Sequence, residues 1–267
     1  KQQRGEQVEN PMELAQLADY MKMQEIRSRV DELVLDKTAA ELLKPWYNRF
    51  CKRPGFSDEY LQTFNRHNVT LVDATVDRGV ARITERGAVV GGKEYPLDCL
   101  IFSTGFDVDN SFTKRVGYGI TGPNGLTLER KWARRPATMH GFATHHFPNL
   151  FMISPTQSGF SLNFAHMIDE QTKHVAYILG RAVKERIRVV EVTQAAEDTW
   201  VAEVEASAAA DEAFQRECTP SYFNAEGDLR RRNARDNIYG GGPVKFYRLL
   251  QDWRALGTMS GLDLTRD

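Results

Sequence analysis

The segment DCLIFSTGFD, residues 98–107, constrains the fold more than any other part of this sequence. A run of apolar side chains ends in a serine, a threonine and a glycine, the pattern of a core strand that runs into a tight turn. In open α/β sheets, ligands bind beyond the carboxyl ends of the strands, and glycine lets the backbone approach a cofactor closely. The segment therefore favours an α/β fold and leaves two interpretations open: a core strand with a turn, or a strand whose end contacts a cofactor.

Hydrophobic spacing predicts the remaining elements. Apolar residues at helical spacing indicate helices over residues 6–44, 164–185, 193–215 and 243–257, with Pro11 in a first turn and Asp36 or Thr38 capping a second short helix within the first range. Short β-branched runs between glycines indicate strands over residues 68–74, 79–87, 87–96, 98–106 and 149–154. Gly91-Gly92 has the composition of a hairpin turn. Trp200 and Trp253 fall on apolar helix faces and are expected in the core.

The strand-rich part of the sequence contains no G-x-G-x-x-G motif after a strand, which is the loop that binds a dinucleotide pyrophosphate. The sequence has segments that complete α/β domains but no obvious segment that opens one. We therefore interpret these residues as the C-terminal part of a longer protein.

Charge and composition restrict the class of protein. The chain carries 35 basic and 36 acidic residues, so no overall field favours nucleic acid or an anionic membrane. No stretch approaches the roughly 18 apolar residues of a membrane span, and the first ten residues lack the apolar core of a signal peptide. Three distant cysteines without C-x-x-C spacing argue against a disulfide framework or a zinc knuckle, so a cytoplasmic location is the default expectation.

The segment RFCKRPGF, residues 49–56, places two cations directly after a cysteine. Lys52 and Arg53 would lower the pKa of a thiol at Cys51, but no histidine lies nearby in the sequence, and a packing role for the cysteine is the simpler interpretation. Two cations are too few for a nucleic-acid surface. A solvated surface pair and a pair that holds a small anion both remain open. Pro54 restricts the backbone of Arg53 to extended conformations.

The segment SPTQSGFSLNF, residues 154–164, leads from a loop into a long predicted helix that Ser161 or Asn163 can cap. A helix N-terminus offers unpaired N–H groups and a positive dipole end, which suit a negatively charged ligand.

The histidines and a basic run are weaker candidates. His140, His145 and His146 form an H-x₄-H-H pattern that matches no helix-borne metal motif, so backbone or solvent partners are expected and no metal site is predicted. His166 and His174 lie two turns apart on a helix, which favours surface or packing positions. The run RRRNAR, residues 230–235, is interpreted as a solvated loop.

Three motifs taken together resemble the flavin-dependent Baeyer–Villiger monooxygenases: CKR at 51–53, STGFD at 103–107 and FPNLF with a following proline at 147–155. None is specific alone, but their order and spacing are, and the similarity continues into YGGGPVKFYRLLQDWRALG and covers essentially the whole chain. Two residues depart from the common pattern, Ser103 in place of alanine and Ser154 in place of glycine. The family's two G-x-G-x-x-G loops and its histidine-containing fingerprint would lie before Lys1.

The resemblance implies an α/β fold, namely the C-terminal part of a two-dinucleotide-binding-domain (Rossmann-like) flavoprotein with a helical insertion. Residues 1–48 would end the helical subdomain, residues 49–103 would form the C-terminal part of the NADPH-binding domain, and residues 104–267 that of the FAD-binding domain. The missing N-terminal half would be the main partner, and the isolated fragment is expected to be inactive.

The implied reaction uses FAD, NADPH and O₂ to insert one oxygen atom next to a ketone carbonyl, giving an ester or lactone. Arg53 is implied as the catalytic residue that stabilises negative charge on flavin-bound oxygen and on the ketone adduct, and Lys52 as the partner of the NADPH 2′-phosphate. The cofactor-binding set implied is Lys52, Thr104, Gly105, Phe106, Gln157 and Asn163, and the ketone-contacting set is Phe160, Leu162 and Phe164. The alternatives are a nitrogen- or sulfur-oxidising relative and a non-catalytic interaction fragment.

Overall fold

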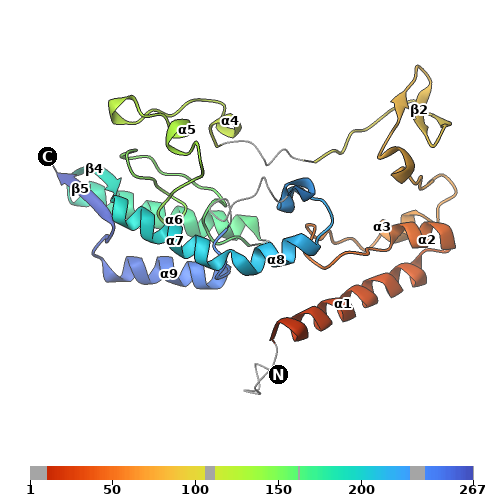
Figure 1. Cartoon of the computed structure of the whole chain (residues 1–267), viewed down its shortest axis with the longest axis horizontal. Helices are drawn as coiled ribbons and strands as arrows, with labels where there is room; N and C mark the ends of the chain where they lie inside the picture. Colours follow the sequence, from red (N-terminus) through yellow and green to blue (C-terminus); the bar gives the residue numbers. More distant parts are fainter. Residues whose placement is uncertain (1–10, 106–111, 162, 229–237, 267) are drawn as a thin grey trace. The chain divides into compact units, whose positions relative to one another are not determined.

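The structure of the chain is a computed structural model that describes residues 11–105, 112–161, 163–228 and 238–266. The chain divides into two compact units, Lys1–Asp107 and Val108–Asp267, and Figure 1 shows the elements of each. Three features named in the sequence analysis lie outside the described residues: Phe106 of the predicted cofactor-binding set, Leu162 of the predicted ketone-contacting set, and the basic run 230–235.

The first unit begins with helices that follow the sequence prediction. Helix α1 spans Pro11–Leu33, α2 spans Lys37–Leu43, and the short α3 spans Tyr60–Thr63. Asp36 caps α2, because its carboxylate accepts a hydrogen bond of 2.8 Å from the backbone N–H of Ala39. The amide of Asn65 bonds both to the backbone N–H of Leu35 and to the carbonyl of Leu33, which fixes the turn between α1 and α2. A small core of Val30, Val34 and Ala40 forms beneath these helices.

The only sheet described in residues 11–105 is a three-stranded antiparallel meander. Its strands are β1 at Arg82–Ile83, β2 at Gly87–Val90 and β3 at Lys93–Pro96, in the order β1-β2-β3. The hairpin turn at Gly91-Gly92 is confirmed, since both residues have positive φ angles (57° and 76°), as a tight primed turn requires. A 3₁₀ turn, η2 at Thr75–Asp77, precedes the sheet.

Two predicted strands of this unit are wrong for the chain as described. Residues 68–74 and 98–105 are all described, and neither range forms a strand. A core strand of a parallel sheet is stabilised by neighbours on both sides, and no other described strand pairs with 98–105. Its apolar side chains are consequently exposed, with Ile101 at 80% and Phe102 at 70% of their accessible surface.

The second unit is largely helical. Its long helices are α6 at Phe164–Lys184, α7 at Gln194–Ser207 and α9 at Pro243–Leu256, of which α6 and α9 match the predicted ranges. The predicted helix 193–215 is two helices, because α7 ends at Ser207 and Ala208 separates it from α8 at Ala209–Glu217. The shorter elements are α4 at Phe112–Val116, η3 at Pro123–Gly125, α5 at Leu128–Lys131 and η4 at Tyr222–Gly227. Among the described helices, none is long and apolar enough to cross a bilayer.

An antiparallel pair of strands, β4 at Ile187–Val192 and β5 at Leu262–Arg266, completes this unit (Figure 1). The core between this sheet and α6 includes Met139, Phe142 and Ile178, and both Trp200 and Trp253 are buried as predicted. The predicted strand at 149–154 is wrong. Those residues form a loop that is held by isolated backbone hydrogen bonds, such as the one from the Met152 N–H to the Phe142 carbonyl.

Candidate functional site

The CKR segment presents its cations to solvent. Cys51 is buried, whereas Lys52 and Arg53 are exposed. The Lys52 ammonium lies 5.9 Å from the centroid of the Tyr47 ring, a cation–π distance that holds the lysine near the surface of its own unit. Residues 53–57 belong to no helix or strand. Cys51 is a disulfide-bonded cysteine, which overturns the expectation that the cysteines form no disulfide. Its buried sulfur has a structural role, and the side chains of Lys52 and Arg53 lie at the surface.

The turn after the apolar segment 98–103 leaves its backbone open. Thr104 and Gly105 are both exposed, and Gly105 has a φ of +85°, which favours glycine. A Cβ atom built on Gly105 would meet no atom of this chain within 4 Å. A planar ligand can therefore approach the peptide at this position without steric conflict from the described residues.

The loop before α6 is held from inside the second unit. Gln157 is completely buried, accepts a hydrogen bond of 2.7 Å from the Thr138 hydroxyl, and donates one of 3.1 Å to the Pro136 carbonyl. Its own carbonyl accepts a bond of 2.9 Å from the Trp200 indole. These contacts make Gln157 a scaffold residue of the loop. The role of this buried side chain in cofactor binding stays a prediction.

Gln171 is a buried residue of α6 that sequence reasoning missed. Its amide oxygen accepts a bond of 3.1 Å from the Ser154 N–H, and its amide nitrogen donates to the Ser154 carbonyl and to the Ser158 hydroxyl, at 2.9 and 2.8 Å. One glutamine therefore ties both ends of the turn 154–158 to the helix that follows. The only sequence signal was a glutamine on the buried face of that helix.

The N-terminus of α6 is capped as predicted. The Asn163 side chain accepts a bond of 3.1 Å from the His166 N–H, and the first turn carries no acidic residue. Phe160 is half-buried and Phe164 is 44% exposed, so an apolar surface adjoins the positive end of the helix dipole. Gln157, Phe160, Asn163 and Phe164 thus belong to the second unit, while Lys52, Arg53, Thr104 and Gly105 belong to the first.

A buried ion pair also escaped sequence analysis. Glu197 is 2% exposed and lies 2.8 Å from the Lys131 ammonium, which is 11% exposed. The carboxylate also accepts bonds from the Thr144 hydroxyl and from the His145 N–H, at 2.8 and 2.7 Å. Four groups from three segments are thereby joined in the interior, which fixes the loop 144–146 against α7.

Two histidines share the core of the second unit. His174 is buried and His140 is half-buried, with ring centroids 6.0 Å apart, and the His174 ring lies 4.8 Å from both Phe142 and Trp253. Burial lowers the pKa of His140 to about 4, and burial together with the nearby His140 and Arg254 lowers the pKa of His174 to about 3. Nδ1 of His140 and both ring nitrogens of His174 have no hydrogen-bond partner among the described residues. Both rings are therefore neutral in the folded protein at neutral pH.

This pair predicts that acid destabilises the second unit. An unfolded histidine has a pKa of about 6.5, so between about pH 6.5 and the lowered folded pKa values the unfolded chain binds more protons, and the free energy of unfolding falls as the pH drops. For His140 alone, a folded pKa of about 4 corresponds to a loss of about 3 kcal/mol at that pH. Denaturant unfolding followed from about pH 7 to about pH 5 measures the slope. His174→Leu should make the free energy of unfolding depend less on pH, whereas His67→Leu, at an exposed histidine, should not. Equal slopes in the two variants would contradict the role of the His140–His174 pair.

Comparisons with known proteins agree on one group of relatives. Pentalenolactone D synthase from Streptomyces arenae is 47% identical over 253 residues, which are 94% of this chain and 43% of that protein. A Baeyer–Villiger monooxygenase from Streptomyces coelicolor is 46% identical over 240 residues, or 90% of this chain and 39% of that protein. The chain thus spans about two fifths of the length of the curated relatives it matches. No family model matches it.

Solved structures give the same result. The polycyclic ketone monooxygenase from Thermothelomyces thermophila matches with a TM-score of 0.86 and 36% identity over 97% of this chain and 43% of that one. A cyclohexanone monooxygenase from Rhodococcus sp. Phi1 bound to NADP⁺ matches with a TM-score of 0.76 and 27% identity, over 94% of this chain and 46% of that one.

Proposed function

Because this chain is homologous over at least 90% of its length to part of the Baeyer–Villiger monooxygenases, we propose that it forms the C-terminal portion of an enzyme that uses FAD, NADPH and O₂ to convert a ketone into an ester or lactone. The observation that carries the proposal is a structural match of TM-score 0.86 to a polycyclic ketone monooxygenase across 97% of the chain. The fold class expected from the resemblance, an α/β two-dinucleotide-binding flavoprotein, is confirmed by these neighbours.

The residues of this chain fit the cofactors in part. Bound FAD would supply oxygen activation, and NADPH would supply the electrons. The open backbone at Thr104 and Gly105 and the capped N-terminus of α6 are surfaces that a flavin can approach. The printed sequence contains no G-x-G-x-x-G loop after a strand, so the pyrophosphate contacts would come from the rest of the enzyme.

Arg53 and Lys52 have separate roles in this proposal. The guanidinium of Arg53 is permanently charged, planar and a multiple donor, so it stabilises negative charge that develops during oxygen transfer and on the ketone oxygen. The compact ammonium of Lys52 binds the NADPH 2′-phosphate. The exposure of both side chains and the extended backbone that Pro54 imposes support these roles.

The loop before α6 forms one wall of the ketone site in this proposal. Phe160, Leu162 and Phe164 supply apolar contacts, Asn163 holds the helix end that faces the flavin, and Gln157 keeps the loop in place. An apolar wall beside a helix N-terminus excludes water while leaving a favourable field for an anion.

We also propose the division of the chain implied by the resemblance: residues 1–48 as the end of a helical subdomain, 49–103 as part of the NADPH-binding domain and 104–267 as part of the FAD-binding domain. The rest of the enzyme is the main partner, and the location is cytoplasmic. The division of the chain into two compact units falls after residue 107, close in sequence to the proposed boundary between the cofactor domains.

The test compares these 267 residues alone with the same residues joined to the remainder of the enzyme. We expect the chain alone to bind no FAD and to oxidise no NADPH, and the joined protein to be yellow and to turn a ketone into an ester. Products are analysed with a ketone and a tertiary amine offered together. Turnover by the chain alone would contradict the partition of the cofactor sites, amine oxide as the main product would assign the nitrogen-oxidising activity, and a colourless joined protein would assign an interaction fragment.

A further inference from the structure

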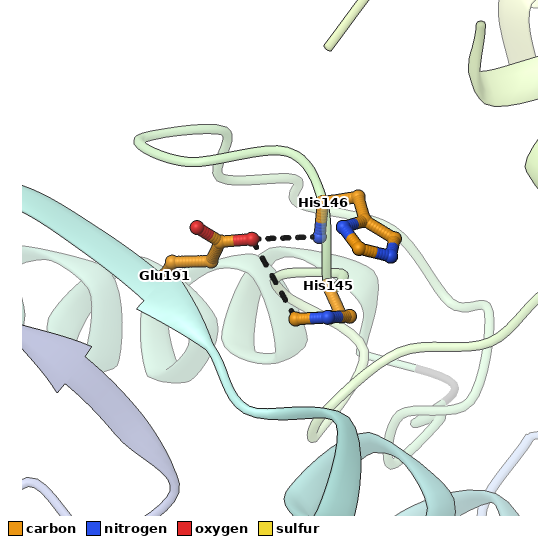
Figure 2. A group of neighbouring side chains, drawn as sticks. All are labelled: His145, His146 and Glu191. Carbon is orange, nitrogen blue, oxygen red and sulfur yellow. Dashed lines mark hydrogen bonds and ion pairs between the residues drawn. The ribbon is translucent and has the colours of Figure 1, made fainter. Parts of the chain in front are cut away.

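A group of three side chains in the second unit has the donor set of a transition-metal site. His145 and His146 lie in the loop before Phe147, and Glu191 lies on β4, with all three side chains drawn in Figure 2. One ligand-capable atom of each residue is within 4.8 Å of those of the other two. Two imidazoles and a carboxylate are ligands that Zn²⁺ prefers. Sequence spacing could not reveal this group, since Glu191 follows His146 by 45 residues.

The backbone of the loop is what brings two adjacent histidines together. Side chains of consecutive extended residues point to opposite sides, but His146 has a φ of +68°. The two imidazole centroids consequently lie only 4.0 Å apart. Two contacts hold this conformation: the His145 N–H donates to the buried Glu197 at 2.7 Å, and the His146 N–H donates to Glu191 at 2.9 Å.

The hydrogen bond of the His145 ring leaves one ring nitrogen with a lone pair for a metal ion. Nδ1 of this ring lies 2.6 Å from the carbonyl oxygen of Val192 and 3.5 Å from a carboxylate oxygen of Glu191. A carbonyl only accepts hydrogen bonds, so Nδ1 carries the proton and Nε2 keeps its lone pair. Histidines that bind metals commonly donate the other ring N–H to a carbonyl or a carboxylate in this manner. The side chain of His145 is 20% exposed and that of Glu191 27% exposed, so an ion and its bound water can enter from solvent.

The charge on β4 and β5 favours a cation at this place. Glu191 is directly paired with Asp263 in the antiparallel register, so both carboxylates project from the same face of the sheet. Like charges in directly opposed positions are destabilising, and a divalent ion bound at Glu191 would offset that repulsion. In the other candidate group among the described residues, His166 with Asp169 and Glu170, both carboxylates are already paired with Lys173, at 2.6 and 2.9 Å.

We propose that His145, His146 and Glu191 bind one divalent transition metal ion, with Zn²⁺ as the preferred ion and water completing its coordination. The ion joins the loop 145–146 to β4, and Asp263 adds a favourable charge nearby. Because only the folded unit holds the three ligands together, binding should also stabilise that unit against unfolding.

The test titrates the purified chain with Zn²⁺ by calorimetry and repeats thermal unfolding with and without the ion. His146→Asn and Glu191→Gln should each weaken Zn²⁺ binding by about tenfold or more and remove the Zn²⁺-dependent rise in the unfolding temperature. Asparagine tolerates a positive φ, and glutamine can still accept the His146 N–H, so both variants keep the loop. His67→Asn and His166→Asn, which remove other exposed histidines, should bind as the unsubstituted chain does.

Co²⁺ provides a second readout, since its visible spectrum reports coordination by nitrogen and oxygen ligands. We expect absorption bands that saturate at one ion per chain and disappear in His146→Asn. The proposal would be overturned if the unsubstituted chain bound neither ion, or if His166→Asn removed binding while His146→Asn and Glu191→Gln retained it. The far-ultraviolet circular dichroism spectrum of each variant, recorded without Zn²⁺, is compared with that of the unsubstituted chain. Variants that are unfolded in the absence of the ion are left out of the comparison.

Discussion

Replacing Arg53 with alanine in the complete enzyme should lower the rate of ester formation by about 10²–10³-fold, the usual effect of removing one group that stabilises a developing oxyanion. Reduction of FAD by NADPH should continue at close to its normal rate, because the guanidinium is proposed to act only on charge that develops after oxygen has reacted. The two half-reactions are measured separately, by flavin absorbance in the absence of oxygen and by product analysis in its presence. NADPH consumption without ester would appear as peroxide released to solvent.

Two further substitutions, one at Arg53 and one at Lys52, separate the proposed roles of these residues. Arg53→Lys keeps the charge but loses the planar, multiple donor, so it should retain part of the ester yield. Lys52→Ala should raise the KM for NADPH while leaving the ester formed per NADPH unchanged, because its proposed partner is the 2′-phosphate. Normal ester yield in Arg53→Ala would refute the role of Arg53. Equal defects in both half-reactions in all three variants would show that the exposed segment 52–53 acts only by supporting the fold.

The elements that could be predicted from the sequence are those whose signals are local. Asp36 caps α2 and Asn163 caps α6 because each needs only an acceptor side chain a few residues before a helical N–H. The Gly91-Gly92 hairpin likewise depends on two residues that adopt positive φ. These features require no knowledge of the rest of the chain, and the structure confirms them.

The predictions that failed, and the elements that were missed, depend on partners that are distant in the sequence. The segment 98–105 has the composition of a core strand but finds no described neighbour with which to pair. Strands β4 and β5 were missed although they pair with each other, because IRVVEV directly follows a helix and LDLTR is short and largely polar. In the candidate site, motif order points to Arg53 and the loop before α6, and their roles stay predictions. The contacts of Gln171, Glu197 and Glu191 connect residues 13 to 66 positions apart and could not be inferred.

Replacing Glu197 with alanine should lower the free energy of unfolding of the second unit by about 3–5 kcal/mol, the usual cost of removing one partner of a buried ion pair. The cost arises because the substitution leaves buried polar groups without a partner. The Lys131 ammonium would be left 11% exposed without its carboxylate, and the Thr144 hydroxyl and the His145 N–H would lose their acceptor. Denaturant unfolding followed by tryptophan fluorescence measures the change, since Trp200 lies on the same helix, α7, and is buried.

Three matched variants separate charge from packing. Asp198→Ala removes the neighbouring exposed carboxylate of α7 and should change the free energy by no more than about 0.5 kcal/mol. Glu197→Gln keeps an acceptor for Thr144 and His145 but leaves the lysine unpaired, so its effect should be intermediate. Adding Lys131→Met to Glu197→Gln should recover stability, because a buried unpaired charge costs more than a buried ion pair contributes. If Glu197→Ala and Asp198→Ala had equal effects, the pair would not stabilise the loop that carries His145 and His146, and the geometry of those residues would need another support.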